Sequence, residues 1–373
     1  NTFVQISGRI MEVVWILVEA TIKALVLFTL ILLGAAALVW EERKVSAFIQ
    51  NRYGPNRVGP FGLLQPFADV FKLFLKEDIY PSAANPFFHR LAPIISLGIT
   101  ISVYAIIPYA HYIKIDDQII KIGIAPDINI GILFLLAMTS IGVYGLTLAG
   151  WSSNSKYSLL GGLRSSAQMI SYELSMGLAL IGVIMVTAAH NFDAVTDPIA
   201  REGISNVLSL NTIVLAQGGL WNIILQPLGF IIFLVASFAE TNRTPFDLPE
   251  AEPELVGGYN TEYSGMKFGM FFLAEYGNMA TSSAIISLLY LGGWQLPFPA
   301  EWFGLEAGTI WLALIQFIVF FIKINILCFF FIWVRWSVPR FRYDQLMKLG
   351  WHVLLPLALL NIVLTGIGIY LIK

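Results

Sequence analysis

Eight long apolar stretches, distributed over the whole chain, constrain the fold more than any other feature. They lie near 13–40, 91–110, 128–149, 168–189, 222–239, 268–292, 309–334 and 350–371. A helix needs about 20 apolar residues to cross a bilayer, and lipid offers no hydrogen-bond partner to an open strand edge. Only 12% of the 373 residues are charged. We therefore expect an all-α integral membrane protein, with eight transmembrane helices in one bundle and a single domain over 1–373.

The orientation of this bundle follows from the positions of its lysines and arginines. The loops 41–90, 150–167, 240–267 and 335–349 carry 7, 2, 2 and 4 of them, whereas the opposite side carries only 5. Basic residues concentrate on the cytoplasmic side of a membrane. The long loops are therefore expected in the cytoplasm, or in the matrix of a mitochondrion, and both termini outside. The chain length and the extended outer loop at 190–221 favour a bacterial inner membrane over a mitochondrial one.

A dense acidic loop lies between the fifth and sixth apolar stretches. Its only cations are Arg243 and Lys267, and three prolines four residues apart interrupt it. It contains six carboxylates, namely Glu240, Asp247, Glu250, Glu252, Glu254 and Glu262. Charge beside hydrocarbon is costly, so this cluster indicates a proton or ion site. The alternative is a solvated spacer, which has no need of such regular prolines.

Three further charged residues lie within the apolar stretches. Glu173 in the fourth stretch and Glu275 in the sixth are each near the cytoplasmic end of a helix, and Lys323 lies midway along the seventh helix. The two glutamates would extend the acidic loop into the bilayer if their helices are neighbours. Lys323 should face a partner or water. Glu19 and Lys23 have the spacing of a local ion pair.

The first cytoplasmic loop combines basic residues with a short amphipathic helix. Gly-Pro turns follow Arg43 and Arg52, and a proline starts the helix at 65–76. Its polar residues Gln65, Asp69, Lys72 and Lys76 form one narrow stripe, and apolar residues cover the rest. This pattern suits either the wall of a wet cavity or a helix lying on the membrane surface, and the two roles are compatible.

Resident redox chemistry lacks sequence support. The chain contains neither dinucleotide nor P-loop motifs, and one cysteine, Cys328, cannot hold an iron–sulfur cluster. The four histidines are not paired as haem ligands, and a net charge of −2 gives no support for nucleic acid. We therefore expect no flavin, haem or iron–sulfur cluster in this chain. Any redox reaction here would need electrons from elsewhere and a lipid-soluble reactant.

Several segments carry a close resemblance to a known family. They are EERKVSAFIQNRYGPNRVGPFGLLQPFADVFKLFLKED, SKYSLLGGLRSSAQMISYE, AETNRTPFDLPEAEPELVGGYNTEYSGMKF, FFLAEY and RYDQLMKLGW. Together they resemble the quinone-site membrane subunit of respiratory complex I, the proton-pumping NADH:quinone oxidoreductase of bacteria and mitochondria. The similarity covers all eight expected helices and all four cytoplasmic loops in order. Pro253 departs from the family pattern and argues against a regular helix through Glu250–Glu254.

The resemblance implies a role for each singled-out residue. The subunit would form the entrance and lower wall of the quinone chamber, and an acidic path from quinone to the pumping subunits. The path residues would be Glu173, Glu240, Asp247, Glu250, Glu252, Glu254, Glu262 and Glu275. The chamber residues would be Arg43, Arg52, Asp69, Lys72, Arg243 and Phe246, and Lys323 would be the intramembrane cation. None would be redox-active, and quinone (ubiquinone or menaquinone) would be the bound substrate.

The implied partners are the soluble quinone-site and terminal iron–sulfur subunits, small membrane subunits, antiporter-like subunits and membrane lipids. Two alternatives belong to other functional classes. A cation/proton antiporter would explain the intramembrane charges, but the Gly/Pro-broken inverted repeats of such transporters are not visible here. The membrane anchor of an energy-converting hydrogenase shares much of the pattern without using quinone. The complete YGPNRVGP and PFDLPEAE motifs favour the quinone enzyme.

Overall fold

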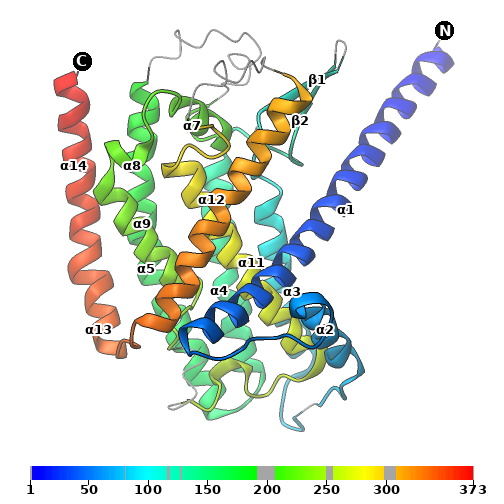
Figure 1. Cartoon of the computed structure of the whole chain (residues 1–373), viewed down its shortest axis with the longest axis vertical. Helices are drawn as coiled ribbons and strands as arrows, with labels where there is room; N and C mark the ends of the chain where they lie inside the picture. The colour runs from blue at the N-terminus through cyan, green and yellow to red at the C-terminus, as the bar shows by residue number, and fades with distance from the viewer. Residues whose placement is uncertain are drawn as a thin grey trace.

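The computed structural model of the protein describes residues 2–79, 81–115, 118–126, 128–190, 206–248, 255–297 and 308–372. Its elements, in chain order, are α1 (Thr2–Ile49), η1 (Pro60–Gly62), α2 (Gln65–Leu75), α3 (Pro86–Tyr104), β1 (Tyr112–Ile115), β2 (Gln118–Lys121), α4 (Gly131–Ser152), α5 (Lys156–Ala189), α7 (Leu210–Ala216), α8 (Asn222–Leu225), α9 (Pro227–Glu240), η3 (Gly258–Asn260), α11 (Gly265–Tyr290), α12 (Ile310–Ser337), α13 (Tyr343–Lys348), the π-helix η5 (Leu349–Leu354) and α14 (Leu355–Ile372). The long helices pack into one bundle, from which the N-terminal half of α1 leans away (Figure 1).

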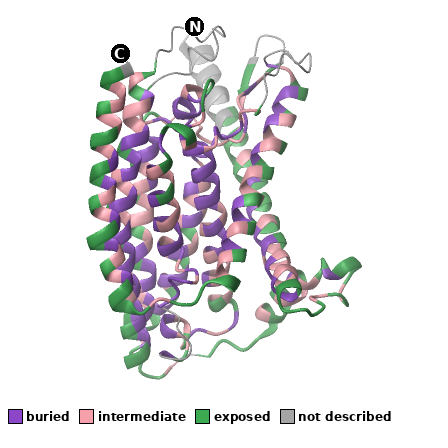
Figure 2. Cartoon of the chain, turned by 60° about the vertical axis from the view of Figure 1, so that its left-hand side comes forward, coloured by how far each residue is buried: buried purple, intermediate pink, exposed green. Residues whose placement is uncertain are grey.

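Six helical segments of the described chain are long and apolar enough to cross a membrane. They are Val18–Ile49 of α1, α3, α4, α5, α12 and the continuous segment Tyr343–Leu371. Their outward sides are exposed and their inward sides buried (Figure 2). An exposed apolar surface of this extent requires lipid or protein to cover it. The molecule is therefore a helical membrane protein.

Two helices at expected membrane positions lie outside this set of six. α9 has only 14 residues, and α11 is long but rich in Ser, Thr, Asn and Gly. The burial of α11 explains its composition, because every residue from Thr281 to Tyr290 is buried. Its main neighbours are α3 and α12. A helix surrounded by protein has no need of an apolar surface, and small or polar residues allow close packing there.

The helix expected at 222–239 is interrupted. α8 ends at Leu225 and α9 begins at Pro227, because Gln226 between them has φ −134° and ψ 59°. A residue before proline is displaced from the helical region by the proline ring. At this break the side-chain amide nitrogen of Gln226 donates to the Gly182 carbonyl and to the Thr365 hydroxyl, both at 2.9 Å.

The segment 150–167, expected as a loop, is mostly helical. α4 continues to Ser152, and α5 starts at Lys156 rather than near 168. Glycine makes this possible, because a Cβ on Gly150 would lie 2.5 Å from the Ser158 carbonyl oxygen and 3.1 Å from the Gly162 Cα. The backbones of α4 and α5 approach so closely here that no side chain fits between them.

A small hairpin is the exception to the all-helical expectation. β1 and β2 pair antiparallel, with Tyr112 opposite Lys121 and Ile115 opposite Gln118. Two isoleucine-rich segments, YIKI and QIIK, joined by two residues are typical of a hairpin, but they are short beside the long apolar stretches that dominate the sequence. The hairpin and both chain ends lie at one end of the molecule, and α2 and α13 lie at the other (Figure 1).

Candidate functional site

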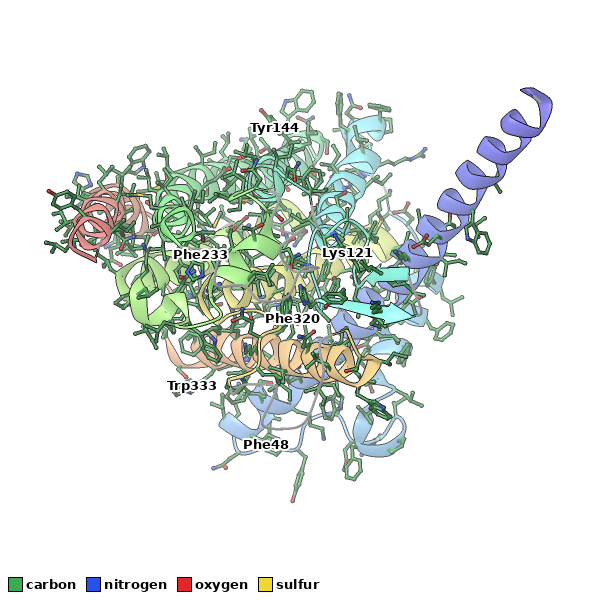
Figure 3. The ribbon with its side chains drawn as sticks, turned by 90° about the horizontal axis from the view of Figure 1, so that it is seen from above. Phe48, Lys121, Tyr144, Phe233, Phe320 and Trp333 are labelled. Atoms are coloured by element: carbon green, nitrogen blue, oxygen red, sulfur yellow. The ribbon has the colours of Figure 1, made fainter. Side chains whose placement is uncertain are left out.

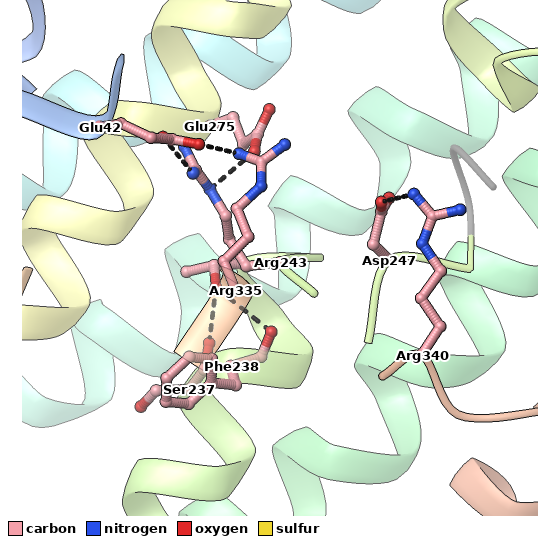
Figure 4. Close-up of polar contacts among 9 residues, drawn as sticks. Glu42, Ser237, Phe238, Arg243, Asp247, Glu275, Arg335 and Arg340 are labelled. Atoms are coloured by element: carbon pink, nitrogen blue, oxygen red, sulfur yellow. Dashed lines mark hydrogen bonds and ion pairs between the residues drawn. The ribbon is translucent and has the colours of Figure 1, made fainter. Parts of the chain in front are cut away.

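The loop after α9 folds so that it carries one arginine into the protein. The Thr241 hydroxyl donates to the Ser237 carbonyl at 3.0 Å and ends the helix. Asn242 then takes a left-handed conformation with φ +50°, which asparagine tolerates. The Arg243 amide donates to Phe238 at 3.4 Å and closes the turn. The Arg243 side chain therefore points toward α1 and α11 (Figure 4).

Arg243 is the centre of a buried cluster of four charges. Its side chain is 1% exposed, with Nη1 2.6 Å from Glu42 Oε2 and Nε 2.7 Å from Glu275 Oε1. Arg335 Nη1 lies 2.5 Å from the other oxygen of Glu42, and the Tyr276 ring lies 4.4 Å from the Arg243 guanidinium carbon. Two arginines and two glutamates balance in charge. A buried ion cluster is tolerated only when it is paired in this way.

The electrostatics keep Arg243 charged despite its burial. Burial lowers the pKa of the guanidinium, but the negative charges of Glu275 and Glu42 raise it by more. The pKa of Arg243 therefore lies well above the usual value. Arg243 thus remains a fixed positive charge. The cluster joins α1, α11 and α12 to the loop after α9.

A second ion pair holds the same loop from the other side. Arg340 Nη2 lies 2.9 Å from Asp247 Oδ2, and the Phe341 amide donates to the Pro245 carbonyl at 3.2 Å. Asp247 is 6% exposed. Burial raises the pKa of Asp247 to about 6; Arg340 opposes the shift, and Glu275 adds to it. This carboxyl can therefore change protonation in the physiological range, unlike an ordinary aspartate.

Carboxylates of α9 and α11, the two helices that flank the loop, line a small cavity of about 60 Å³ with mixed polar and apolar walls. Glu240 and Glu275 line it, together with Asn278 of α11 and hydroxyls of Ser and Thr from α3, α4, α9 and α11. A water needs roughly 10–15 Å³ by this measure, so about four waters fit. Glu173 interacts electrostatically with Glu240 and accepts a hydrogen bond from Ser140 Oγ of α4.

The other residues expected in the acidic path are placed differently. Glu262 is partly buried between η3 and α11, where its carbonyl oxygen lies 3.4 Å from His89 Nε2, and it does not line the cavity. Glu250, Glu252 and Glu254 lie outside the described residues, as does Pro253. The structure therefore brings together Glu173, Glu240 and Glu275.

Three of the expected chamber residues form a second polar group where α1 meets α2. Arg43 Nη1 lies 2.5 Å from Asp69 Oδ2, and Lys72 Nζ lies 3.8 Å from the other oxygen of Asp69. Arg52 is exposed, and its Nε donates to Gln50 at 2.7 Å. Phe246 is 3% exposed and packs between Tyr172 and Phe341, each with its ring centroid 5.4 Å away. Phe246 is thus a packing residue in this structure, and its place in a chamber remains a prediction.

Lys323 donates to three backbone carbonyls. Its Nζ donates to the carbonyls of Leu291, Gly293 and Gln295 at 2.7, 2.8 and 2.8 Å, and it lies 4.4 Å from the centre of the Trp221 ring. The acceptors lie in the turn that follows α11. A cation there complements the negative end of the helix dipole.

Sequence reasoning missed three members of the site: Glu42, Arg335 and Arg340. The hydropathy pattern places Glu42 at the start of a cytoplasmic loop, but α1 stays helical through Ile49 and keeps Glu42 inside the bundle, 5% exposed. The available signal was a carboxylate directly after an apolar run. The two arginines fall in a basic segment whose composition suggests contact with lipid or a partner. No group of three or more possible metal ligands occurs within the described ranges.

Comparison with known proteins finds similarity over nearly the whole chain. A family model described as NADH dehydrogenase matches residues 22–366. The chain is similar to the H subunit of the NADH-quinone oxidoreductase of Salinibacter ruber, with 51% identity over 95% of this chain and 97% of the relative. It is 52% identical to subunit 8 of the corresponding Rhodothermus marinus enzyme, over 93% and 97%. The H subunit from Flavobacterium psychrophilum is 44% identical over 96% and 98%.

Proposed function

The chain belongs to the NADH dehydrogenase family, and on that basis we propose that it is the quinone-site membrane subunit of a proton-pumping NADH:quinone oxidoreductase. In this role it forms the entrance and lower wall of the quinone chamber and the start of the acidic path. The observation that carries the proposal is the buried Glu42–Arg243–Glu275 cluster. It places Glu42, the sequence neighbour of Arg43, in one ionic cluster with Glu275, which lines the cavity between the helices.

The described ion pairs form two groups that adjoin along α1. Arg43 and Asp69 lie where α1 meets α2, and Glu42 is the residue next to Arg43. Glu42 pairs with Arg243, which also pairs with Glu275. Glu275 faces the same cavity as Glu240. We infer that a charge change at the first group biases the second across this short separation, and the acids at the cavity through Glu275.

The chemistry at the quinone is supplied by the substrate and by electrons from partner subunits: reduction takes up two electrons and two protons. This chain's residues respond to the negative charge that develops near Arg43 and Lys72. The cations that pair with Glu42 and Glu275 are drawn toward that charge and therefore stabilise these two carboxylates less. As a result, the proton affinity of the coupled acids rises. Glu173, Glu240 and Glu275 would then take and pass on protons as a group, with cavity water between them.

The eight-helix arrangement and the orientation are part of the same proposal. α9 and α11 would cross the bilayer inside the bundle, in addition to the six apolar segments. Both termini would lie outside, and α2 and α13 on the cytoplasmic side of a bacterial inner membrane. The partners would be the soluble quinone-site and terminal iron–sulfur subunits, small membrane subunits and antiporter-like subunits. The exposed apolar face of α2, which includes Phe71, Phe74 and Leu75, would contact lipid or one of these subunits.

The test of this function is native purification followed by mass spectrometry of the co-purified chains. We expect NADH-oxidising and iron–sulfur subunits, together with quinone reductase activity that quinone-site inhibitors block. Recovery with a nickel hydrogenase subunit would instead identify a hydrogenase anchor. Recovery of a homogeneous complex of this chain alone, with cation/proton exchange in vesicles, would identify an antiporter.

The Asp247–Arg340 pair predicts a specific pH dependence. Because the pKa of Asp247 is raised to about 6, from about 4 in an unfolded chain, its contribution to stability is present below pH 4. It is lost as the pH rises through 6. Asp247→Asn resembles the protonated form and should remove this dependence. Above pH 7 the variant should be more resistant to thermal unfolding than the wild type, by at most about 3 kcal/mol.

The measurement is the thermal inactivation of the assembled enzyme between pH 4.5 and 8, compared between wild type and variant so that other titrating groups cancel. The two should converge at the acid end. Asp344→Asn, at an exposed position near the same segment, is the matched control and should parallel the wild type. A constant difference at every pH would show that Asp247 does not titrate in this range.

A further inference from the structure

A large apolar cavity lies between α1 and the rest of the bundle. Its volume is about 620 Å³. α1 and α12 form its two long walls, α11 closes it at the back, and β2 and the chain after α3 bound one end. The lining is almost wholly aliphatic and aromatic, with Leu30, Ile120 and Phe321 as typical members. Seen from above, α1 projects away from the other helices (Figure 3).

The cavity is a long wedge. At its narrow end Leu38, Ala284 and Cys328 are 6%, 2% and 0% exposed, because α1 there rests on α11 and α12. On α1 the lining extends from Ile22 to Leu38, which is about 24 Å along a helix. One leaflet of a bilayer core is about 15 Å thick. A chain lying along the inclined α1 could therefore fill the wedge from within one leaflet.

We propose that this cavity holds an acyl chain of a phospholipid, whose phosphate lies beside Lys23 and Lys121. These two lysines line the wide end, one on α1 and the other on β2. Lys23 also pairs with Glu19 at 2.7 Å and is 34% exposed. An ammonium has three donors, so Lys23 can bind a phosphate oxygen and keep Glu19. Cations above an apolar slot match an anionic headgroup above its chain.

The shape argues against a transmembrane helix of a partner as the occupant. A helix with its side chains is about 10 Å wide and cannot reach the narrow end, where α1 touches α11 and α12. A flexible chain of methylenes can. An occupied cavity would also fill the space beside the N-terminal half of α1, and so fix the inclination of the helix that carries Glu42. The inference concerns lipid binding and does not depend on the quinone function.

Gly34 offers a direct test, because it lines the cavity and a Cβ added to it would meet nothing within 4 Å. Gly34→Leu should therefore fill the slot without a clash. Gly98→Leu is the matched control: Gly98 is an exposed glycine on α3 that also has open space around it and does not line the cavity. The assembled complex would be reconstituted with phosphatidylglycerol that carries a photoreactive diazirine on one acyl chain.

We expect crosslinks on the α1 and α11 peptides that line the cavity, reduced about tenfold in Gly34→Leu and unchanged in Gly98→Leu. Lys23→Gln combined with Lys121→Gln should weaken labelling by phosphatidylglycerol but not by phosphatidylcholine. Labelling that is equal in wild type and Gly34→Leu would show ordinary boundary lipid and overturn the proposal. Capture of a partner subunit, rather than lipid, by a photoreactive residue placed at position 34 would also overturn it.

Discussion

Arg243→Ala should reduce NADH:quinone activity at least about tenfold, which is 1.4 kcal/mol of lost stabilisation, while NADH oxidation by an artificial acceptor stays near the wild-type rate. The physical reason is the loss of the buried cation that lies between Glu42 and Glu275. Glu42 keeps Arg335, but Glu275 loses its partner and must bind a proton or move away. The ionic contact that joins Glu42 to Glu275 through Arg243 is then broken.

Two further variants separate this effect from a general loss of structure. Arg243→Lys keeps the charge but cannot reach Glu42 and Glu275 in the geometry of a guanidinium, so it should recover only part of the activity. Arg342→Ala removes an arginine from the same side of the protein that is 81% exposed, and it should behave like the wild type. The measurement is both activities on equal amounts of purified complex. A parallel loss of the two in Arg243→Ala would indicate failed assembly instead of broken coupling.

The sequence predicted most of the helices because hydropathy alone places an apolar segment in a membrane. The break at Gln226 and the early start of α5 depend on local backbone geometry that a hydropathy pattern does not contain. Pro227 was visible in the sequence, but a proline within an apolar stretch does not reveal whether a helix bends or stops. The close approach of Gly150 to α5 depends on which helices are neighbours.

The sequence revealed only some of the site residues, for a related reason. Arg243 could be singled out because it is one of two cations in a run of acids. Its partner Glu42 lies 201 positions away in the chain, and Arg335 lies 293 positions from Glu42. Only the packing of α1 against α11 and α12 brings them together. Lys323 was expected to face a partner or water, but the sequence could not identify the partners as backbone carbonyls of the turn after α11.

Glu275→Gln and Glu173→Gln should separate quinone binding from proton pumping. Both residues lie within helices, and the cavity that Glu275 lines with Glu240 is away from the Arg43–Asp69 group. Glutamine keeps the size and an acceptor oxygen but cannot exchange a proton at physiological pH. We expect each variant to keep a quinone KM within about twofold of the wild type and to lose most proton pumping and turnover, by about tenfold.

The matched control is Glu19→Gln, which changes the same chemical group on α1 at a position where the side chain is 57% exposed. Glu19 does not line the cavity that Glu240 and Glu275 share, so its substitution should leave both the quinone KM and proton pumping unchanged. Since Glu173 acts on Glu240 and Glu240 shares a cavity with Glu275, the three acids should behave as one unit. The double variant should then cost little more than the worse single one.

The experiment is a measurement of quinone KM, turnover and protons pumped per NADH in reconstituted vesicles, for both single variants and the double variant. Glu275→Gln also leaves Arg243 with Glu42 as its remaining counter-ion, so it should affect turnover more than Glu173→Gln. Normal pumping in both single variants would remove these acids from the pathway. A large rise in KM with normal pumping would place Glu275 in quinone binding, and additive losses in the double variant would mean that the two acids serve separate routes.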